Sequence, residues 1–282
     1  MYATYFEFDG INSQDLGIML ISYDGFSEDT GTVSTGSEIT FNTTKAPSAK
    51  KWNYHSPNYE TQLTFSFQIA KIQCGMLDDI ELSQAECAYL MRWLVRADGF
   101  HMLRFIQNEY ENTYFNCQMT SQLLKTPDGK IIGMQLQATC DAPFGYSEIK
   151  TYDVSVDNGG TFQIYDDGDE VGSVIFDQVD ITFNSGTQKF TLTNDMDAVY
   201  SPMITYVTEI KNVAKGEKVS IKNHQITSSI SAHSIGKDFN YRYPRLINLF
   251  GINGEQRINT YTVSGCGCKI TFQYRTIRKI LP

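Results

Sequence analysis

A group of carboxylates is the feature of this 282-residue chain that most suggests metal chemistry. Four acidic side chains surround Gly168, and carboxylates clustered in a turn can bind calcium. An EF-hand loop places its ligands at alternating positions and ends on a glutamate at its twelfth position, and this segment lacks that pattern. We therefore interpret the cluster as a solvated hairpin tip. Its members are Asp166, Asp167, Asp169 and Glu170.

Two cysteines separated by one residue, Cys266 and Cys268, resemble a redox or metal-binding pair. A structural zinc site needs two further ligands, usually a second pair, and the chain has no second closely spaced pair of cysteines. The nearest histidines, His224 and His233, are far away in the sequence. We therefore predict no zinc site, with a site assembled only by folding as the alternative.

Histidine is the usual base of hydrolases, where it lies beside a nucleophile and an orienting acid. The chain has no G-x-S-x-G motif, and it has no Walker A or dinucleotide-binding motif. Ser231 and Ser234 flank one histidine in a polar stretch, which we interpret as coincidence. We thus predict no enzyme activity and no catalytic, cofactor-binding or metal-binding residues. The histidines considered are His55, His101, His224 and His233.

The net charge of −9 argues against nucleic acid as the main ligand, because nucleic-acid binders present clustered Lys and Arg. A small basic group near the end, Arg275, Arg278 and Lys279, is interpreted as the outward face of a terminal strand. Ile270, Phe272 and Tyr274 should line its buried face. No apolar run approaches the ~20 residues that span a bilayer, and the start does not resemble a signal peptide. We expect synthesis in a cytosol, with mostly reduced cysteines.

Strands should dominate the fold, because aromatic residues make up 13% of the chain and Thr is frequent. The segment TQLTFSFQIA alternates strictly between apolar and polar residues, as a half-buried strand does. Its apolar face comprises Leu63, Phe65, Phe67 and Ile69.

One helix is predicted, over residues 83–97. Ser83 and Glu86 have the spacing of a capping box, in which each side chain bonds a free N–H at the start of the helix. Asp98-Gly99 is the expected stop. The buried face should comprise Cys87, Leu90, Met91 and Leu94.

The pattern of residues 113–144 predicts a β-hairpin. If Asp128-Gly129 is a two-residue turn, paired residues sum to 257. Leu123 then faces Met134, and Cys117 faces Cys140 with both side chains in the core. A disulfide between these cysteines is geometrically conceivable, but buried thiols are favoured.

Residues 27–60 differ from their surroundings, since they are rich in Ser, Thr and Gly and poor in aliphatic residues. We interpret them as strands and loops with little core, forming an arm that lies on a neighbouring subunit. Beyond Glu148, short strands such as TFQIYD, DITF, KFTLT and KVSI follow in quick succession without a helical pattern. This spacing predicts a β-sandwich. Both tryptophans, Trp52 and Trp93, lie in the first half, which weakens a sugar-binding role for the second.

The order of these features resembles the phage distal tail (Dit) family. The opening TYFEFDGINSQDLGIML, the helical LSQAECAYLMRWLVRADGFHMLRF and the strand IIGMQLQATCDAPFGYS are similar to its first domain. The end, from Tyr241 through PRLIN to CKITFQYRTIRKI, is similar to its C-terminal pattern. The turn over residues 249–256 is longer than is usual, and Thr276 stands where Pro is common. Residues 150–240 carry no specific motif.

The resemblance implies a mainly β protein of two domains. Residues 1–146 would form a β-sandwich with one α-helix that builds a hexameric ring, and residues 147–267 a galectin-like β-sandwich. We expect residues 268–282 to return to the first domain. The implied partners are the tail tube protein, a tail-tip protein and a receptor-binding protein, with DNA passing through the ring unbound. No cofactor is implied.

Three classes of function compete. A structural hub predicts a ring and no turnover. A carbohydrate-binding module of an adhesion device predicts exposed aromatic side chains clustered in the second domain. A cell-wall hydrolase predicts a zinc site or two carboxyl groups at the separation that glycosidases use. The sequence favours the hub, and sugar binding could coexist with it because a galectin-like fold does not establish that activity.

Overall fold

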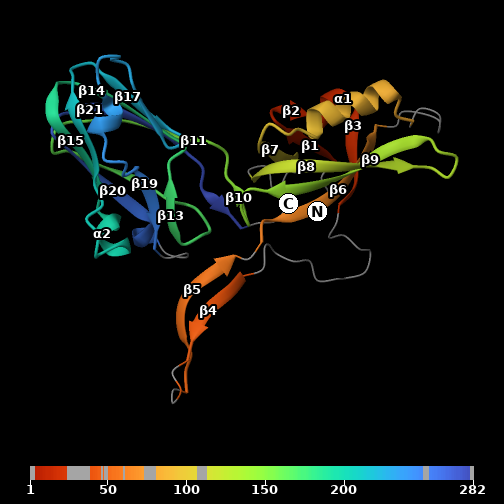
Figure 1. Cartoon of the computed structure of the whole chain (residues 1–282), viewed down its shortest axis with the longest axis horizontal. Helices are drawn as coiled ribbons and strands as arrows, with labels where there is room; N and C mark the ends of the chain where they lie inside the picture. The colour runs from red at the N-terminus through yellow and green to blue at the C-terminus, as the bar shows by residue number, and fades with distance from the viewer. Residues whose placement is uncertain are drawn as a thin grey trace. The chain divides into compact units, whose positions relative to one another are not determined.

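The computed structural model describes residues 4–23, 39–45, 47, 50–59, 61–72, 81–106, 113–249 and 254–279. The chain divides into two compact units (Figure 1). Unit 1 comprises Met1–Tyr146 with Lys279–Pro282, and unit 2 comprises Ser147–Arg278. Each has its own cluster of buried apolar side chains, and both are built mainly from strands, as the sequence predicts.

Unit 1 is built on one antiparallel sheet in the order β2-β1-β7-β8-β9-β6-β3. Leu20 lies on β3, the last strand in this order, and its N–H donates a hydrogen bond of 2.9 Å to the carbonyl of Thr4, just before β1. The sheet is therefore curled, with β3 next to the start of β1. The expected two layers are therefore halves of one curled sheet. The elements are β1 (Tyr5–Phe8), β2 (Ile11–Asn12), η1 (Ser13–Leu16), β3 (Ile18–Tyr23), β6 (Thr64–Lys71), β7 (His101–Ile106), β8 (Tyr114–Lys125), β9 (Ile131–Cys140) and β10 (Gly145–Tyr146).

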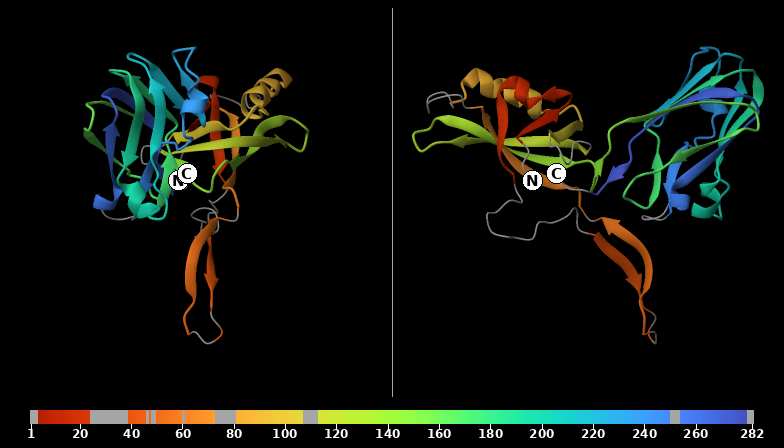
Figure 2. Two further views of the ribbon diagram at one scale, coloured as in Figure 1. Left: turned by 60° about the vertical axis from the view of Figure 1, so that its left-hand side comes forward. Right: turned by 180° about the vertical axis from the view of Figure 1, so that it is seen from behind.

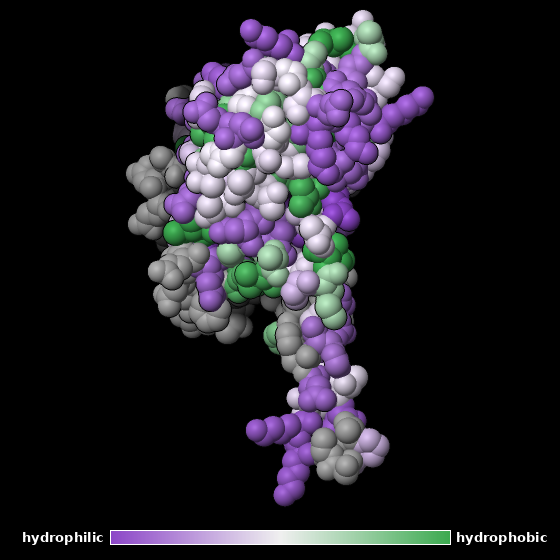
Figure 3. Space-filling model, turned by 90° about the vertical axis from the view of Figure 1, so that its left-hand side faces the viewer, coloured by the Kyte–Doolittle hydropathy of each residue, from purple (hydrophilic) through white to green (hydrophobic). Residues whose placement is uncertain are grey.

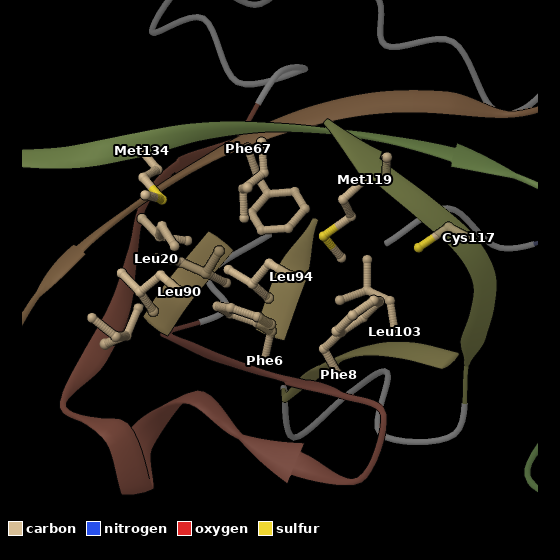
Figure 4. Close-up of a cluster of buried hydrophobic side chains, with 14 of the residues drawn as sticks. Phe6, Phe8, Leu20, Phe67, Leu90, Leu94, Leu103, Cys117, Met119 and Met134 are labelled. Carbon is tan, nitrogen blue, oxygen red and sulfur yellow. The ribbon is translucent and has the colours of Figure 1, made fainter. Parts of the chain in front are cut away.

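The alternation in TQLTFSFQIA is confirmed. Strand β6 buries its four predicted apolar side chains, and its alternate residues are exposed or half-buried. Phe67 meets both Phe6 and Phe105 edge to face, with ring centroids 5.6 and 5.3 Å apart. Such aromatic pairs join strands that are distant in the sequence into one core (Figure 4).

Helix α1 (Gln84–Leu94) begins with the predicted capping box. The Ser83 N–H donates to Glu86 Oε2 at 2.8 Å, and the Glu86 N–H donates to Ser83 Oγ at 3.2 Å. The helix lies along one side of the sheet, and its Leu90 and Leu94 point toward Phe6 and Phe67 (Figures 2 and 4).

Two details of the helix prediction are wrong. The helix ends at Leu94, three residues before its predicted end at Ala97, and Met91 is 44% exposed. Trp93 is buried instead, because its ring stacks on Phe6 with centroids 5.6 Å apart and its indole N–H donates to the Phe8 carbonyl at 3.1 Å. These contacts rotate the buried face of the helix toward Trp93.

The hairpin of β8 and β9 has the predicted register. Cys117 faces Cys140, Leu123 faces Met134, and both cysteines are free and fully buried. The two-residue turn is wrong. Thr126–Lys130 form a longer loop in which the Gly129 N–H donates to the Thr126 carbonyl, and the register shifts by one after Leu124. Pro127 suits the second position of a type I turn, and Gly129 has the positive φ of 90° that the accompanying bulge requires.

The remaining strands of unit 1, β4 (Ile39–Thr44) and β5 (Asn53–Tyr59), form a separate two-stranded hairpin. Among the described residues they pair only with each other, and none of their side chains belongs to either core. At its base, the ring of Tyr59 meets that of Phe144 with centroids 6.3 Å apart. The prediction of strands with little core is confirmed for this part, and residues 27–38 of the predicted arm lie outside the described residues.

Unit 2 is the predicted sandwich. One sheet has the order β11-β21-β14-β17-β18 and the other β12-β20-β15-β16, with the core between them. The elements are β11 (Lys150–Val156), β12 (Thr161–Tyr165), β13 (Gly172–Ile175), β14 (Gln178–Phe183), β15 (Thr187–Asn194), α2 (Met196–Tyr200), β16 (Thr208–Val213), β17 (Lys218–Lys222), β18 (Gln225–Ser228), α3 (Ile235–Asp238), β19 (Arg245–Asn248), η3 (Gly254–Arg257), β20 (Ile258–Ser264), β21 (Cys268–Tyr274) and β22 (Ile277–Arg278).

Two predictions for this half are corrected. Helices α2 and α3 were not expected, because elements of five and four residues are too short to show helical periodicity. The return of residues 268–282 to the first domain is wrong for β21, which lies between β11 and β14 inside the unit 2 sheet. Ile270, Phe272 and Tyr274 do line its buried face, as predicted.

Candidate functional site

The carboxylate cluster around Gly168 is an ion-pair network and not a solvated tip. Asp167 accepts hydrogen bonds from Lys150 Nζ, from Thr276 Oγ1 at 2.8 Å and from Arg278 Nη2 at 2.9 Å. Burial opposes its ionisation, but these bonds outweigh burial and lower the pKa of Asp167 to about 2. The solvated-tip prediction is wrong because folding brings cations from both ends of unit 2 to this turn.

The same network links the first and last segments of unit 2. The Ser147 N–H donates to the Thr276 carbonyl at 2.8 Å, and the Thr276 N–H donates back to Ser147 Oγ at 3.0 Å. Asp166 is buried and accepts from the Gly168 N–H, and burial raises its pKa. These contacts pair Asp167 with cations and Asp166 with a backbone donor, and they link the two ends of unit 2.

The basic residues at the end belong to this framework. Arg278 pairs with Asp167, and Arg275 Nη1 lies 3.6 Å from Asp177 Oδ2. Arg275 and Arg278 keep only part of the solvent exposure expected for an outward face, because both are half-buried and ion-paired, whereas Lys279 is exposed.

The cysteines are positioned as inert core residues. Cys266 and Cys268 are buried in the unit 2 core, and burial raises the pKa of Cys268 to about 12. Burial also raises the pKa of Cys117, and that of Cys140 to about 12. Because the thiolate is the nucleophile and the metal ligand, these thiols are poorly suited to either role. Across the described ranges, no three His, Cys, Asp or Glu side chains come together as a metal site.

The four histidines have separate surroundings. His55 Nε2 lies 2.7 Å from Thr44 Oγ1 in the β4–β5 hairpin. His101 lies 2.9 Å from Asp98, and the ring of His224 packs edge-on against Tyr243. His233 does not use Ser231 or Ser234. It lies between Glu217 and Asp238, at 2.5 and 3.1 Å, two partners that sequence spacing did not reveal.

His233 links α3 to the β-sandwich of unit 2. Its side chain is 7% exposed and that of Glu217 is 1% exposed. Glu217 also accepts from Ser228 Oγ on β18, and the second carboxylate, Asp238, belongs to α3. Burial disfavours the charged imidazole, but the hydrogen bonds and charges of Glu217 and Asp238 outweigh it and raise the pKa of His233. For Glu217, burial is likewise outweighed by hydrogen bonds from Ser228, His233 and the Ala214 N–H, which lower its pKa.

We expect the stability of unit 2 to depend on pH through this group. The raised pKa of His233 adds stability that is complete below its ordinary value of 6.5 and lost as pH rises through the folded value. The lowered pKa of Glu217 adds stability that is complete above 4.5 and lost as pH falls through the folded value. The contribution is therefore greatest between these two ordinary values.

Urea unfolding of the wild type and of His233→Gln at pH about 5.5 and about 8.5 tests this expectation. The substitution should destabilise the protein more at the lower pH, because Gln keeps a polar side chain but cannot carry the charge. Equal destabilisation at both pH values would contradict it.

The β4–β5 hairpin is the candidate surface for assembly. Phe41 is 64% exposed and Trp52 is 65% exposed, whereas Trp93 is buried in the core. Lys45 Nζ lies 5.8 Å from the centre of the Trp52 ring. In Figure 3, hydrophilic side chains extend from the far end of the hairpin. An isolated hairpin is marginally stable in water, so this element is expected to rest on another surface.

In the part of the chain that the structure describes, no helix is long and apolar enough to cross a membrane.

Two family models match most of the chain. Residues 1–142 match the family model for the phage tail protein N-terminal domain, and residues 144–274 match that for the phage tail C-terminal domain. No curated protein matches. The fold is similar to the crystal structure of SPP1 Dit (gp 19.1), described as a paradigm of the hub adsorption apparatus of phages that infect Gram-positive bacteria. The identity is 10%, the TM-score is 0.61, and the match covers 97% of this chain and 99% of that one.

The phage p2 baseplate in its activated conformation also matches, at 9% identity over 96% of this chain and 98% of that one, with a TM-score of 0.47. The family models describe the two units in the same order in which the structure divides them. The chain therefore belongs to the phage tail protein family, with the N-terminal and C-terminal domains of that family in succession.

Proposed function

We propose that this protein is a hub subunit of the tail tip, which forms a hexameric ring joining the tail tube to the tail-tip and receptor-binding apparatus. The observation that carries the proposal is the exposed β4–β5 hairpin, in a chain whose fold is similar to a hub protein over nearly its whole length. The role is structural and involves no turnover of a substrate.

The hairpin has the properties of an intersubunit arm. Within the described ranges, its two strands pair only with each other, and large apolar side chains are exposed on it. Such surfaces are rare on monomers and usually mark a contact with another chain. When an arm of one subunit rests on a different surface of the next, the contact is head-to-tail, and repetition closes a ring if the rotation fits.

The two units are proposed to have different roles. Residues 1–146, which contain the arm, are proposed to build the ring, and residues 147–278 to form the galectin-like domain that receives a receptor-binding protein. The tail tube protein and a tail-tip protein are the proposed partners of the ring, and DNA passes through it without specific binding. The protein would be synthesised in the cytoplasm of the host bacterium and reside in the virion tail.

Electron microscopy of the purified full-length chain tests the proposal. We expect rings with six-fold symmetry and a central channel, and a solution mass of about six subunits by sedimentation. Dispersed monomers at all concentrations tested would refute ring formation.

A sugar-binding role for unit 2 receives less support. Tyr200 and Tyr206, which could stack on a sugar, have Arg245 on their faces, with its guanidinium carbon 5.2 and 3.9 Å from the ring centres. Tyr241 is exposed, but its hydroxyl donates to the Gly236 carbonyl and its ring packs against Phe239. These three rings do not form the free aromatic platform that the carbohydrate-binding alternative predicts.

A further inference from the structure

Charge is distributed unevenly within the first 146 residues. They contain 17 Asp and Glu against nine Lys and Arg. Three of those nine, Lys45, Lys50 and Lys51, lie within residues 39–59, which contain no acidic residue. The hairpin is therefore a basic element in a domain whose remaining residues are strongly acidic.

The three lysines differ from most of the other cations of unit 1, although Arg92 and Lys125 are also exposed and without an ion pair among the described residues. Lys71 pairs with Glu86, Arg104 with Glu7, and Arg96 with two aspartates. By contrast, Lys45, Lys50 and Lys51 are exposed, and none of them has an ion pair with any residue that the structure describes. Lys45 instead lies near the exposed ring of Trp52. The end of the hairpin thus presents an aromatic side chain flanked by exposed lysines that have no ion pair among the described residues.

We infer that this hairpin tip, defined as Lys45, Lys50, Lys51 and Trp52, docks on the acidic surface of unit 1 of a second copy of the chain. The inference rests on the proposed ring and names what its arm binds. A second copy is the occupant favoured by charge, because every copy offers an acidic unit 1 to the basic tip of its neighbour. Trp52 would provide the apolar anchor, since tryptophan is enriched among the residues that dominate binding energy at interfaces.

This contact makes assembly sensitive to salt. Charges exposed at the rim of an interface are screened over ~10 Å at about 0.1 M salt and over ~3 Å at about 1 M. An arm held only by apolar burial would not weaken in this way. Salt dependence therefore separates an electrostatic tip from a purely apolar one.

The test compares three full-length proteins by sedimentation velocity in about 50 mM and about 500 mM NaCl. The first is the wild type, and the second carries Lys45→Glu, Lys50→Glu and Lys51→Glu. The third is a control with the same charge change on unit 2, Lys215→Glu, Lys222→Glu and Lys269→Glu, at exposed positions. We expect the wild type and control to assemble at low salt, with the subunit dissociation constant rising about tenfold or more at high salt. The tip variant should assemble about 100-fold more weakly at low salt.

Carbodiimide cross-linking of a mixture of isotope-labelled and unlabelled wild-type chains identifies the docking surface. We expect links from Lys45, Lys50 or Lys51 to Asp or Glu of residues 1–146 that join a labelled chain to an unlabelled one. Links confined to one copy, or to the acids of residues 147–278, would overturn the inference.

The outcomes separate the inference from the proposed function. If the wild type forms rings and the tip variant assembles equally well at both salt concentrations, the tip does not act as inferred although the ring stands. If the tip variant assembles normally but loses affinity for duplex DNA, the tip is a nucleic-acid contact and the inference is overturned. A wild type that remains monomeric refutes the ring and the inference together.

Discussion

Replacing residues 40–58 by a short Gly-Ser linker should leave both units folded and prevent assembly. The hairpin strands pair only with each other among the described residues, and no described side chain of the hairpin enters a core. The linker keeps Tyr59, whose ring meets Phe144 at the base. The melting temperature should therefore change by no more than about 3 °C, while the assembly constant falls by at least about 100-fold.

Point substitutions provide a milder version of this experiment. Phe41→Ser and Trp52→Ser remove the large apolar side chains of the arm, each more than 60% exposed. Leu123→Ser is the matched control, because Leu123 is 40% exposed on the other long hairpin of unit 1. Each arm variant should weaken assembly by about tenfold or more, and the control should not. Assembly of the linker variant at wild-type strength would show that the arm is not the contact.

The second large effect is expected at Asn259, a fully buried amide in unit 2. Its Oδ1 accepts from the Ile247 N–H and from Asn194 Nδ2, both at 2.8 Å. Its Nδ2 donates to the Ile247 carbonyl at 3.0 Å and to the Arg257 carbonyl at 3.2 Å. One side chain therefore joins β20 to β19 and to the end of β15.

Asn259→Ala should lower the free energy of unfolding of unit 2 by about 3–5 kcal/mol. The substitution removes the side-chain partners of the Ile247 N–H and carbonyl and one of the two acceptors of Asn194 Nδ2. Each buried polar group left unsatisfied costs about 1–3 kcal/mol. Asn158→Ala is the matched control, because Asn158 is exposed and accepts one hydrogen bond, from the Gly265 N–H at 2.9 Å. The control should cost about 1 kcal/mol or less.

Urea unfolding followed by circular dichroism measures this effect. Tryptophan fluorescence provides an internal reference, because both tryptophans lie in unit 1 and Trp93 is buried there. Destabilisation of Asn259→Ala no greater than that of Asn158→Ala would show that the amide network does not support the sandwich.

Features set by neighbouring residues were predictable from the sequence. The spacing of Ser83 and Glu86 located the start of α1, and strict alternation located the buried face of β6. The register of the β8–β9 hairpin was also predictable, because the buried side chains of both strands must share one face. The turn was not predicted correctly. Pro127 favours a type I turn in a longer loop, and a β-bulge after Leu124 accommodates the additional residue.

Features made by distant residues were not predictable. Asp167 looked like a member of a solvated acidic turn until folding placed Lys150 and Arg278 against it. His233 looked like part of a polar stretch until Glu217, 16 residues earlier, came within 2.5 Å. Trp93, and not Met91, is buried because it contacts Phe6 and Phe8. These two residues lie about 85 positions earlier in the chain, so sequence spacing did not reveal the contact.

The sequence by itself determined that this protein is mainly β with one capped helix, that its second half is a sandwich, and that it resembles a tail protein. These properties depend on alternation, capping and turn residues, which act over a few positions. Only the tertiary structure decided which charges are neutralised within the chain and which remain available. The acidic turn at Asp167 is satisfied internally, whereas the lysines of the β4–β5 hairpin are exposed. That difference depends on which strands pair across the chain, because a charge is neutralised only when folding brings an opposite charge within a few ångströms.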